Sequence, residues 1–301
     1  MHVMFSVERH PTAARFLIAA GEFLGRREAE HNLQFGIASH LIADEALAFD
    51  DVVRHPYLAT VRGVDGHAVV GSALMTPPFD LVLSCLADEV RAQAVGALVR
   101  DLATFDVQPP GVLGPVEVAH TFAAAWCAGR ALTVRRARAE RIYQLKRVRP
   151  PRNVGGHARI ATPADRELLI DWIRSFLVEV NGEDPDTIRD DRPADLVASS
   201  LDRGQGTVYL WEVDGAAVSM ARAHGETPNG IRIGPVYTPP EVRGHGFASA
   251  VTAAASQASL DAGRRFVFLF TDLANPTSNK IYQAIGYEPV IDIDQLAFDP
   301  A

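Results

Sequence analysis

The stretch VYTPPEVRGHGFASA, Val236 to Ala250, decides how the second half of this chain folds. A β-rich segment from Ile231 to Tyr237 leads through two prolines to a pair of glycines, Gly244 and Gly246. A helix beginning at about Gly246 is predicted by apolar residues that recur at helical spacing: Phe247, Ala250, Val251 and Ala254. A glycine pair between a strand and a helix indicates that a ligand approaches the backbone there.

The chemistry of this junction favours an anion. Unpaired backbone N–H groups and the positive end of the helix dipole converge at a helix N-terminus. Without Cβ atoms at Gly244 and Gly246 an anion can reach those donors, and Arg243 adds a cation, which together predict a pyrophosphate site. The dinucleotide fingerprint fails because Ser249 stands where its third glycine belongs, and no Gly-Lys-Ser/Thr follows for a P-loop.

A second motif follows in FVFLFTDLANPTSNKIYQAIGYEPV, Phe266 to Val290. Its pattern predicts a buried strand, a short turn, and a helix closed by Gly286 and Tyr287. Asn275 precedes Pro276, which is typical of a helix N-cap followed by proline at the first helical position. Such a cap contributes about 1 kcal/mol.

Together the two motifs resemble the GNAT-type N-acetyltransferases. Arg243-Gly-His-Gly246-Phe-Ala248, preceded by Pro240, is similar to that family's coenzyme A pyrophosphate loop, Arg/Gln-x-x-Gly-x-Gly/Ala. The family's second segment is matched by Asn275, Ser278, Tyr282, Gly286 and Tyr287. The resemblance covers about residues 157–297 and is especially close to a bacterial subgroup with a divergent N-terminal half.

The resemblance implies acetyl-CoA as co-substrate and a sheet that splays between the strands Ile231–Tyr237 and Phe266–Asp272. Free backbone groups of Val236, Tyr237 and Thr238 are then expected to pair with the pantetheine amides, as in strand addition by a ligand. The pyrophosphate is expected on the main chain of Arg243, Gly244, His245, Gly246, Phe247 and Ala248. Asn275 and Ser278 complete the expected cofactor-binding residues.

Tyr282 occupies the position of the family's general acid, and the resemblance assigns it protonation of the leaving thiolate. A tyrosine on a helix is also an ordinary core residue, so this alternative stays open. Glu212, Glu226 and Asp272 are candidates for the base that the attacking amine needs. The acidic loop Glu183–Asp195 favours a cationic acceptor, although a charge run is also typical of a solvated face.

Two halves of similar pattern indicate a tandem protein. Val-Asp-Gly-x-Ala-Val occurs twice, and each copy predicts a hairpin, one around Asp65-Gly66 and one around Asp214-Gly215. We predict domains 1–150 and 151–301, joined by the basic, proline-rich stretch Lys146–Gly156. The fold class is α+β with a mixed sheet: two GNAT-like units, each a twisted, mostly antiparallel sheet flanked by helices.

The first half is the divergent one. Its helices are expected at Ala87–Ala103 and Val116–Ala128, around a strand at Gly111–Gly114, with a closing pair of strands around Ile142–Lys146. It has no equivalent of the glycine pair, so it is expected to shape the acceptor cleft or to support the fold. The basic run Lys146–Arg152 is interpreted as a solvated linker, with an anion site as the alternative.

Composition excludes several other classes of protein. The net charge of −8 argues against binding of nucleic acid or of an anionic membrane surface, and no apolar run approaches the ~20 residues of a membrane span. Cys85 and Cys127 are interpreted as free thiols in a reducing cytoplasm. The ten histidines show no metal-binding spacing, so no metal is expected.

The resulting hypothesis is an acetyltransferase that moves the acetyl group directly from acetyl-CoA to an amine, with Tyr282 as general acid. Direct transfer is favoured because neither cysteine lies near the motifs. The alternative is a non-catalytic module that binds or senses acyl-CoA. The sequence selects neither a particular acceptor, whether small molecule or peptide, nor an oligomeric state.

Overall fold

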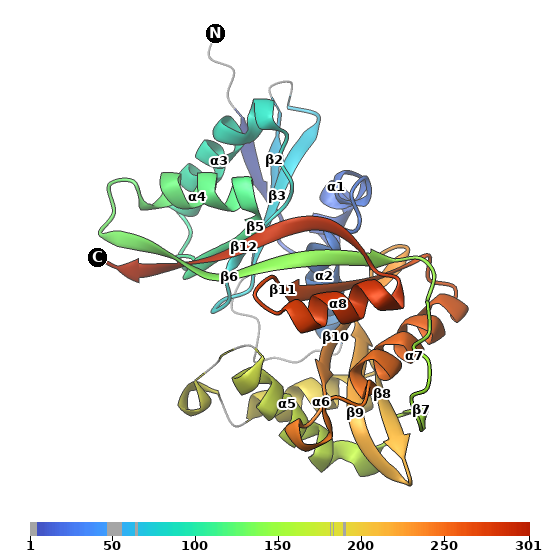
Figure 1. Cartoon of the computed structure of the whole chain (residues 1–301). Helices are drawn as coiled ribbons and strands as arrows, with labels where there is room; N and C mark the ends of the chain where they lie inside the picture. Colours follow the sequence, from blue (N-terminus) through green and yellow to red (C-terminus); the bar gives the residue numbers. More distant parts are fainter. Residues whose placement is uncertain (1–4, 47–55, 64–65, 181, 183, 189–190) are drawn as a thin grey trace. The chain divides into compact units, whose positions relative to one another are not determined.

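Contacts between residues divide the chain into two units. Figure 1 shows the computed structural model of the chain. The structure describes residues 5–46, 56–63, 66–180, 182, 184–188 and 191–301. Unit 1 comprises Met1–Tyr143, Phe270–Asn275 and Pro289–Ala301, and unit 2 comprises Gln144–Leu269 and Pro276–Glu288. Residues 289–301 thus pack with the first half of the chain. The domain boundary between residues 150 and 151 stays a prediction.

Unit 1 is built on a mixed sheet with the strand order β1-β2-β3-β4-β5-β12-β6. Its strands are β1 (Ser6–Arg9), β2 (Tyr57–Arg62), β3 (Val69–Met75), β4 (Leu81–Leu83), β5 (Gly111–Pro115), β6 (Leu132–Leu145) and β12 (Glu288–Pro300). Antiparallel pairing runs from β1 to β4, β4 and β5 are parallel, and β12 pairs antiparallel with β5.

One expectation for the first half is wrong. The predicted closing pair of strands around Ile142–Lys146 is a single long strand, β6. The antiparallel partner of β5 is β12, which comes from the end of the chain and pairs Ile293–Ala297 with Gly111–Pro115. A pattern in nearby sequence cannot reveal a partner strand that lies so far along the chain.

Helices cover both faces of the unit 1 sheet. Successive side chains of a strand point to opposite faces, so neighbouring residues of β2 pack against different helices. Tyr57, Ala59 and Val61 of β2 pack in the core that contains α3 (Asp88–Leu102) and α4 (Val116–Cys127). Leu58 packs with α1 (Ala13–Gly25) and α2 (Asn32–Ala46) instead. The predicted helices at Ala87–Ala103 and Val116–Ala128 are confirmed.

Unit 2 contains the strands in the order β11-β10-β9-β8-β7. They are β7 (His157–Ile160), β8 (Thr207–Val213), β9 (Ala216–His224), β10 (Gly230–Tyr237) and β11 (Phe266–Asp272), of which Phe266–Leu269 belong to unit 2 and Phe270–Asp272 to unit 1. The predicted hairpin between β8 and β9 is confirmed, with Asp214 at φ 49° and Gly215 at φ 79°. In unit 1, β2 and β3 also form the predicted hairpin, but Asp65 of its turn lies outside the described residues.

The helices of unit 2 are α5 (Arg166–Glu179), α6 (Asp191–Leu201), α7 (Phe247–Asp261) and α8 (Pro276–Ile285), with short 3-10 turns at Pro163–Asp165, Pro185–Thr187 and Pro240–Val242. The apolar face of α5 is buried with α6 against Leu210 and Tyr237. At the first of these turns, the N-cap residue Thr162 forms a capping box with Asp165. Helix α7 contacts β8, β9 and β10. The predicted α+β fold class is confirmed.

Candidate functional site

The loop between β10 and α7 is shaped by its two glycines. Gly244 has φ +85° and Gly246 has φ +82°, a backbone conformation that L side chains rarely adopt. Gly246 is the N-cap of α7, which begins at Phe247 as the sequence predicted. The first N–H groups of α7 have no partner inside the helix and therefore point into this loop.

The two glycines differ in the space around them. A Cβ atom at Gly246 would come within 3.1 Å of Val154 Cγ2, whereas a Cβ at Gly244 would have no neighbour within 4 Å. At Gly244 the backbone conformation alone therefore requires glycine. The absence of a side chain also leaves the space beside Gly244 open to a ligand.

The cation that Arg243 adds beside the glycines already has partners in the structure. Its Nε donates to the Thr238 carbonyl at 2.8 Å, and its Nη2 donates to Glu179 Oε2 at 2.7 Å. The guanidinium also lies 5.8 Å from the centre of the Tyr237 ring. Both charged groups are partly exposed, so this ion pair contributes at most about 1 kcal/mol. An anionic ligand can therefore compete with Glu179 for the cation.

Glu179, at the end of α5, is a residue that the sequence analysis missed. Its Oε1 accepts a hydrogen bond from the Tyr237 hydroxyl at 2.8 Å. Hydrogen bonds from Arg243 and then from Tyr237 hold the pKa of Glu179 below its ordinary value, so the carboxylate stays ionised. Because Glu179 and Arg243 are far apart along the chain, no local motif could have connected them.

His245 and Phe247 lie beside the glycines. Their rings stack with centroids 5.5 Å apart. His245 Nδ1 lies 3.0 Å from the Arg243 carbonyl, a geometry in which the imidazole donates to the backbone. The side chain is exposed, in accord with a loop contact rather than with a catalytic base.

The pairing at the end of β10 bears on the splayed sheet that the resemblance implied, and one of its features differs from that expectation. The parallel register of β10 with β11 covers Gly230–Arg232 against Phe266–Phe268, whereas β10 continues to Tyr237. On its other side, β10 pairs Val236 with Ala221 and Tyr237 with Met220, after an irregularity in register.

The difference concerns the backbone groups that were expected to be free. The Tyr237 carbonyl accepts a hydrogen bond from Ser219 Oγ at 3.0 Å, and the Thr238 carbonyl accepts from Arg243. Side chains from β9 and from the loop therefore occupy two of the acceptors at the end of this strand. A pantetheine amide that uses either carbonyl has to displace or share that bond.

The second motif forms α8, and the helix begins at Pro276 as predicted. Just before it, the Asn275 N–H donates to the Asp272 carbonyl at 3.0 Å, and the Ala274 N–H donates to Asp272 Oδ1 at 2.7 Å. Ser278 and Tyr282 are four residues apart on α8, a spacing that places both side chains on one face of the helix.

Tyr282 is partly buried, and its ring meets that of Tyr287 edge-on at 6.1 Å. The Tyr287 hydroxyl lies 2.8 Å from Ser256 Oγ of α7, which connects this aromatic pair to the helix that follows the glycine loop. Burial disfavours the phenolate and raises the pKa of Tyr282 to about 12. At neutral pH the phenol is therefore protonated. Its hydroxyl makes no hydrogen bond within the described residues, so its proton is available to a ligand.

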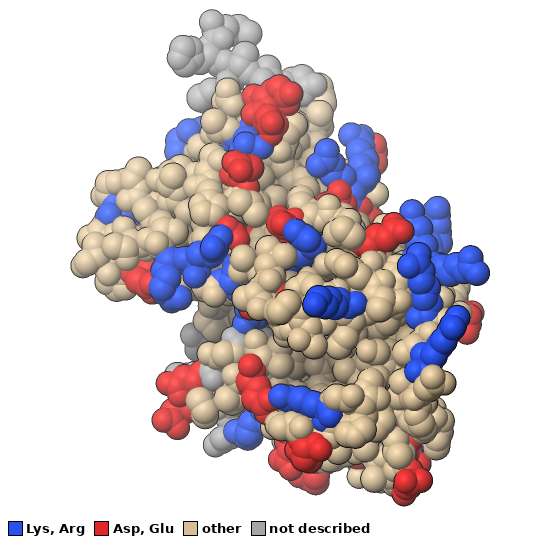
Figure 2. Space-filling model, in the orientation of Figure 1, with Lys and Arg blue, Asp and Glu red and all other residues tan. Residues whose placement is uncertain are grey.

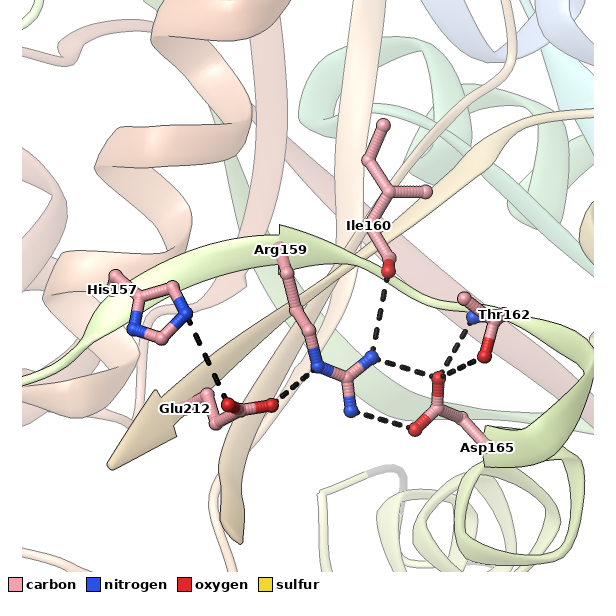
Figure 3. A network of polar contacts seen from close by, with 6 residues as sticks. All are labelled: His157, Arg159, Ile160, Thr162, Asp165 and Glu212. Atoms are coloured by element: carbon pink, nitrogen blue, oxygen red, sulfur yellow. Dashed lines mark hydrogen bonds and ion pairs between the residues drawn. The ribbon is translucent and has the colours of Figure 1, made fainter. Parts of the chain in front are cut away.

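The three predicted candidates for a general base are all engaged. Glu212 Oε2 accepts from Arg159 Nε at 2.5 Å, in a network with His157, Thr162 and Asp165 (Figure 3). Glu226 pairs with Arg264 at 2.5 Å, and Asp272 accepts from the backbone of Ala274.

Their positions also differ. Glu226 precedes β10, and the eight residues of that strand span about 26 Å. Glu226 is therefore at the wrong end of β10 to act beside Tyr237. Nη1 and Nη2 of Arg159 both donate hydrogen bonds to the carboxylate of Asp165. These hydrogen bonds are the largest cause that lowers the pKa of Asp165 to about 2. The Glu212 network therefore serves as a structural clamp at the start of α5.

Unit 1 presents different chemistry at the corresponding junction. Its parallel strands β4 and β5 resemble β10 and β11, and α3 follows β4 as α7 follows β10. However, the first turn of α3 carries Asp88 and Glu89 in place of glycines. Carboxylates already occupy the positive end of this helix, so it repels a pyrophosphate.

In the part of the chain that the structure describes, no set of three or more His, Cys, Asp and Glu side chains is arranged to hold a metal ion. None of the described helices combines the length and the apolar character needed to cross a membrane.

The second half of the chain is similar to a known protein family. Residues 167–287 match the model of the Acetyltransferase (GNAT) family, a range that contains the glycine loop and the second motif as far as Tyr287. No curated protein matches the sequence.

Three solved structures share the fold of nearly the whole chain. A Drosophila protein has a TM-score of 0.67 and 12% identity, with 98% of each chain covered. A GCN5-related N-acetyltransferase from Sphaerobacter thermophilus has a TM-score of 0.57 and 17% identity, with 98% of this chain and 95% of that one covered. A tandem GNAT protein of the clavulanic acid pathway has a TM-score of 0.55 and 16% identity, with 98% of each covered. The chain thus has the fold of tandem GNAT proteins, and its residues 167–287 match the model of the acetyltransferase (GNAT) family.

Proposed function

We propose that unit 2 is an N-acetyltransferase that transfers the acetyl group of acetyl-CoA directly to an amine. The observation that carries this proposal is the pair of left-handed glycines at the start of α7, inside a region that matches the acetyltransferase family. In the proposed complex the pyrophosphate accepts hydrogen bonds from the main chain of residues 243–248. Val236, Tyr237 and Thr238 face the pantetheine arm, and Asn275 and Ser278 contribute from the second motif.

The proposed reaction begins with attack of a neutral amine on the thioester carbonyl. The carbon–nitrogen bond forms, the carbon–sulfur bond breaks, and one proton passes from the amine to the departing thiolate. Tyr282 is the proposed general acid because its phenol stays protonated at neutral pH. A main-chain N–H at the end of β10 is the proposed donor to the oxyanion.

The pKa of Tyr282 limits how the proton moves. A thiol has a pKa of about 8.5, so full transfer from a phenol of pKa about 12 costs about 5 kcal/mol. We therefore infer that Tyr282 passes its proton to the sulfur as the carbon–sulfur bond breaks and takes a proton from the attacking amine in the same step, so that no free phenolate forms. The net source of the proton is the amine.

For the acceptor we propose a cationic amine that pairs with Glu179 before it loses its ammonium proton to solvent water. Glu179 is ionised, is partly exposed, and is bonded to Tyr237 at the end of β10. The acidic loop Glu183–Asp195 adds negative charge near the end of α5, although Glu183 and residues 189–190 lie outside the described part of the chain. The cytoplasmic location stays a prediction.

Thiol release from acetyl-CoA across a panel of amines tests the activity. The expected result is release with at least one amine, and a fall in kcat for Tyr282→Phe with acetyl-CoA affinity close to that of the wild type. Binding of acetyl-CoA without release on any amine contradicts catalysis and favours the acyl-CoA-binding module. A stable acetylated protein after stoichiometric acetyl-CoA contradicts direct transfer.

A further inference from the structure

A hollow of about 830 Å³ in unit 2 has no role in the proposed reaction. It is lined by the segment that follows β6, together with Gly286 and Glu288 at the end of α8. Its volume lies within the range of small-molecule sites, about 300–1,000 Å³. Four of its lining residues are cationic: Lys146, Arg147, Arg149 and Arg152.

The backbone of this segment is held against α8. The Arg149 N–H donates to the Ile285 carbonyl at 2.6 Å. Gly286 has φ +113°, and a Cβ atom there would lie 2.7 Å from the Arg147 carbonyl oxygen. Pro150 and Pro151 further restrict the chain. The cations therefore project from a braced backbone, which lowers the entropy lost when a ligand orders them.

The positive charge of the hollow is not neutralised locally. None of the four cations forms an ion pair with a carboxylate among the described residues. Lys146 lies 5.6 Å from the centre of the Phe266 ring, and Arg265 approaches the same ring at 5.3 Å. Figure 2 shows Lys and Arg side chains gathered along the right-hand edge of the view, over the segment that follows β6 in Figure 1.

The end of α8 does not account for so much charge. A helix C-terminus is equivalent to about −0.5 of a charge, so a single cation suffices to complement it. Glu288 supplies one carboxylate against four cations. The net charge of the whole chain is −8, so this group of unpaired cations is opposite in sign to the protein as a whole. The fold does not require so many cations at this place.

We propose that this hollow binds a small ligand that carries clustered phosphates. Arginine side chains bind phosphate oxygens through paired N–H donors, and four cations match the charge of two or more phosphate groups. Two sources have this chemistry: the 3′-phosphorylated nucleotide end of coenzyme A, or a separate polyphosphate or nucleotide.

The first source is supported by the course of the segment toward the glycine loop. Arg152 is two residues before Val154, so their Cα atoms lie within about 7 Å. Val154 in turn sits where a Cβ at Gly246 would touch it, at 3.1 Å. The coenzyme A source rests on the proposed function, whereas binding of clustered phosphates does not.

Calorimetry of the full chain with sodium tripolyphosphate tests the site. We expect saturable heat at low salt that weakens at high salt, and at least tenfold weaker binding for the variant Arg147→Glu/Arg149→Glu. The matched control, Arg15→Glu/Arg100→Glu, changes two exposed arginines of unit 1 and should bind as the wild type does. Equal thermal unfolding midpoints confirm that both variants fold. No heat from the wild type, or equal binding by the two variants, overturns the proposal.

Acetyl-CoA and its 3′-dephospho form distinguish the two sources. If the hollow holds the 3′-phosphate, the wild type prefers acetyl-CoA, tripolyphosphate competes with it, and Arg147→Glu/Arg149→Glu erases the preference. A second outcome is that Arg147→Glu/Arg149→Glu binds tripolyphosphate more weakly than the control variant but keeps the preference for acetyl-CoA over its 3′-dephospho form. In that case the ligand is a separate polyphosphate. If neither thioester binds while tripolyphosphate does, the proposed acetyltransferase function fails and the phosphate site stands.

Discussion

Replacing Gly244 by alanine should separate the cost of backbone strain from the loss of a ligand site. Gly244 has φ +85°, and an added Cβ would meet nothing within 4 Å. Gly215, in the turn between β8 and β9, has φ +79° and an equally open Cβ position. Neither substitution creates a clash, so each should destabilise the fold through strain alone, by about 1–2 kcal/mol.

Only one of these two positions belongs to the proposed cofactor loop. In Gly244→Ala the same strain favours loop conformations that do not present the N–H groups, and 1–2 kcal/mol corresponds to about a 5–30-fold loss of apparent affinity. Gly215→Ala should bind acetyl-CoA as the wild type does.

Two measurements decide the outcome. Urea denaturation gives the loss of stability, which should be similar for the two variants, and calorimetric titration gives the affinity for acetyl-CoA. Wild-type affinity in Gly244→Ala, together with the expected loss of stability, would refute the assignment of the loop. An equal loss of affinity in Gly215→Ala would show that general destabilisation is the cause.

Three further predictions concern side chains of unit 2. The ratio of wild-type to Tyr282→Phe kcat should be well above one and stay constant as pH rises through 10, because the raised pKa keeps the phenol protonated until about 12; a fall in this ratio near pH 10 contradicts the raised pKa, and a ratio of one at every pH contradicts the assigned role. Glu179→Gln should lower the KM for acetyl-CoA by up to about fivefold, since about 1 kcal/mol no longer holds Arg243, and should raise the KM for a cationic amine; unchanged values for both would dismiss the ion pair as a competitor. Tyr287→Phe should lower the free energy of unfolding by about 1 kcal/mol through loss of the buried bond to Ser256, and urea denaturation with an unchanged midpoint would show that this bond is not stabilising.

Local sequence patterns predicted most elements of unit 2. The strand before Tyr237, the helix after Gly246, the turn at Asp214-Gly215 and the helix at Pro276 all lie where spacing and turn chemistry placed them. Each of these signals depends on residues within one or two turns of chain. Positive φ at a glycine is a requirement of the backbone itself, so a single sequence can reveal it.

Contacts between distant segments were not predictable in this way. Glu179 holds Arg243 across 64 residues, and β12 closes the unit 1 sheet beside β5 from the other end of the chain. The braced arginines around Gly286 also looked like an ordinary solvated linker, because the hollow exists only where that linker meets the end of α8. Sequence therefore established the glycine loop and the elements on either side of it. Folding alone determined which charges that loop and its neighbours meet, because a side chain's partner depends on where other elements pack and not on the residues beside it.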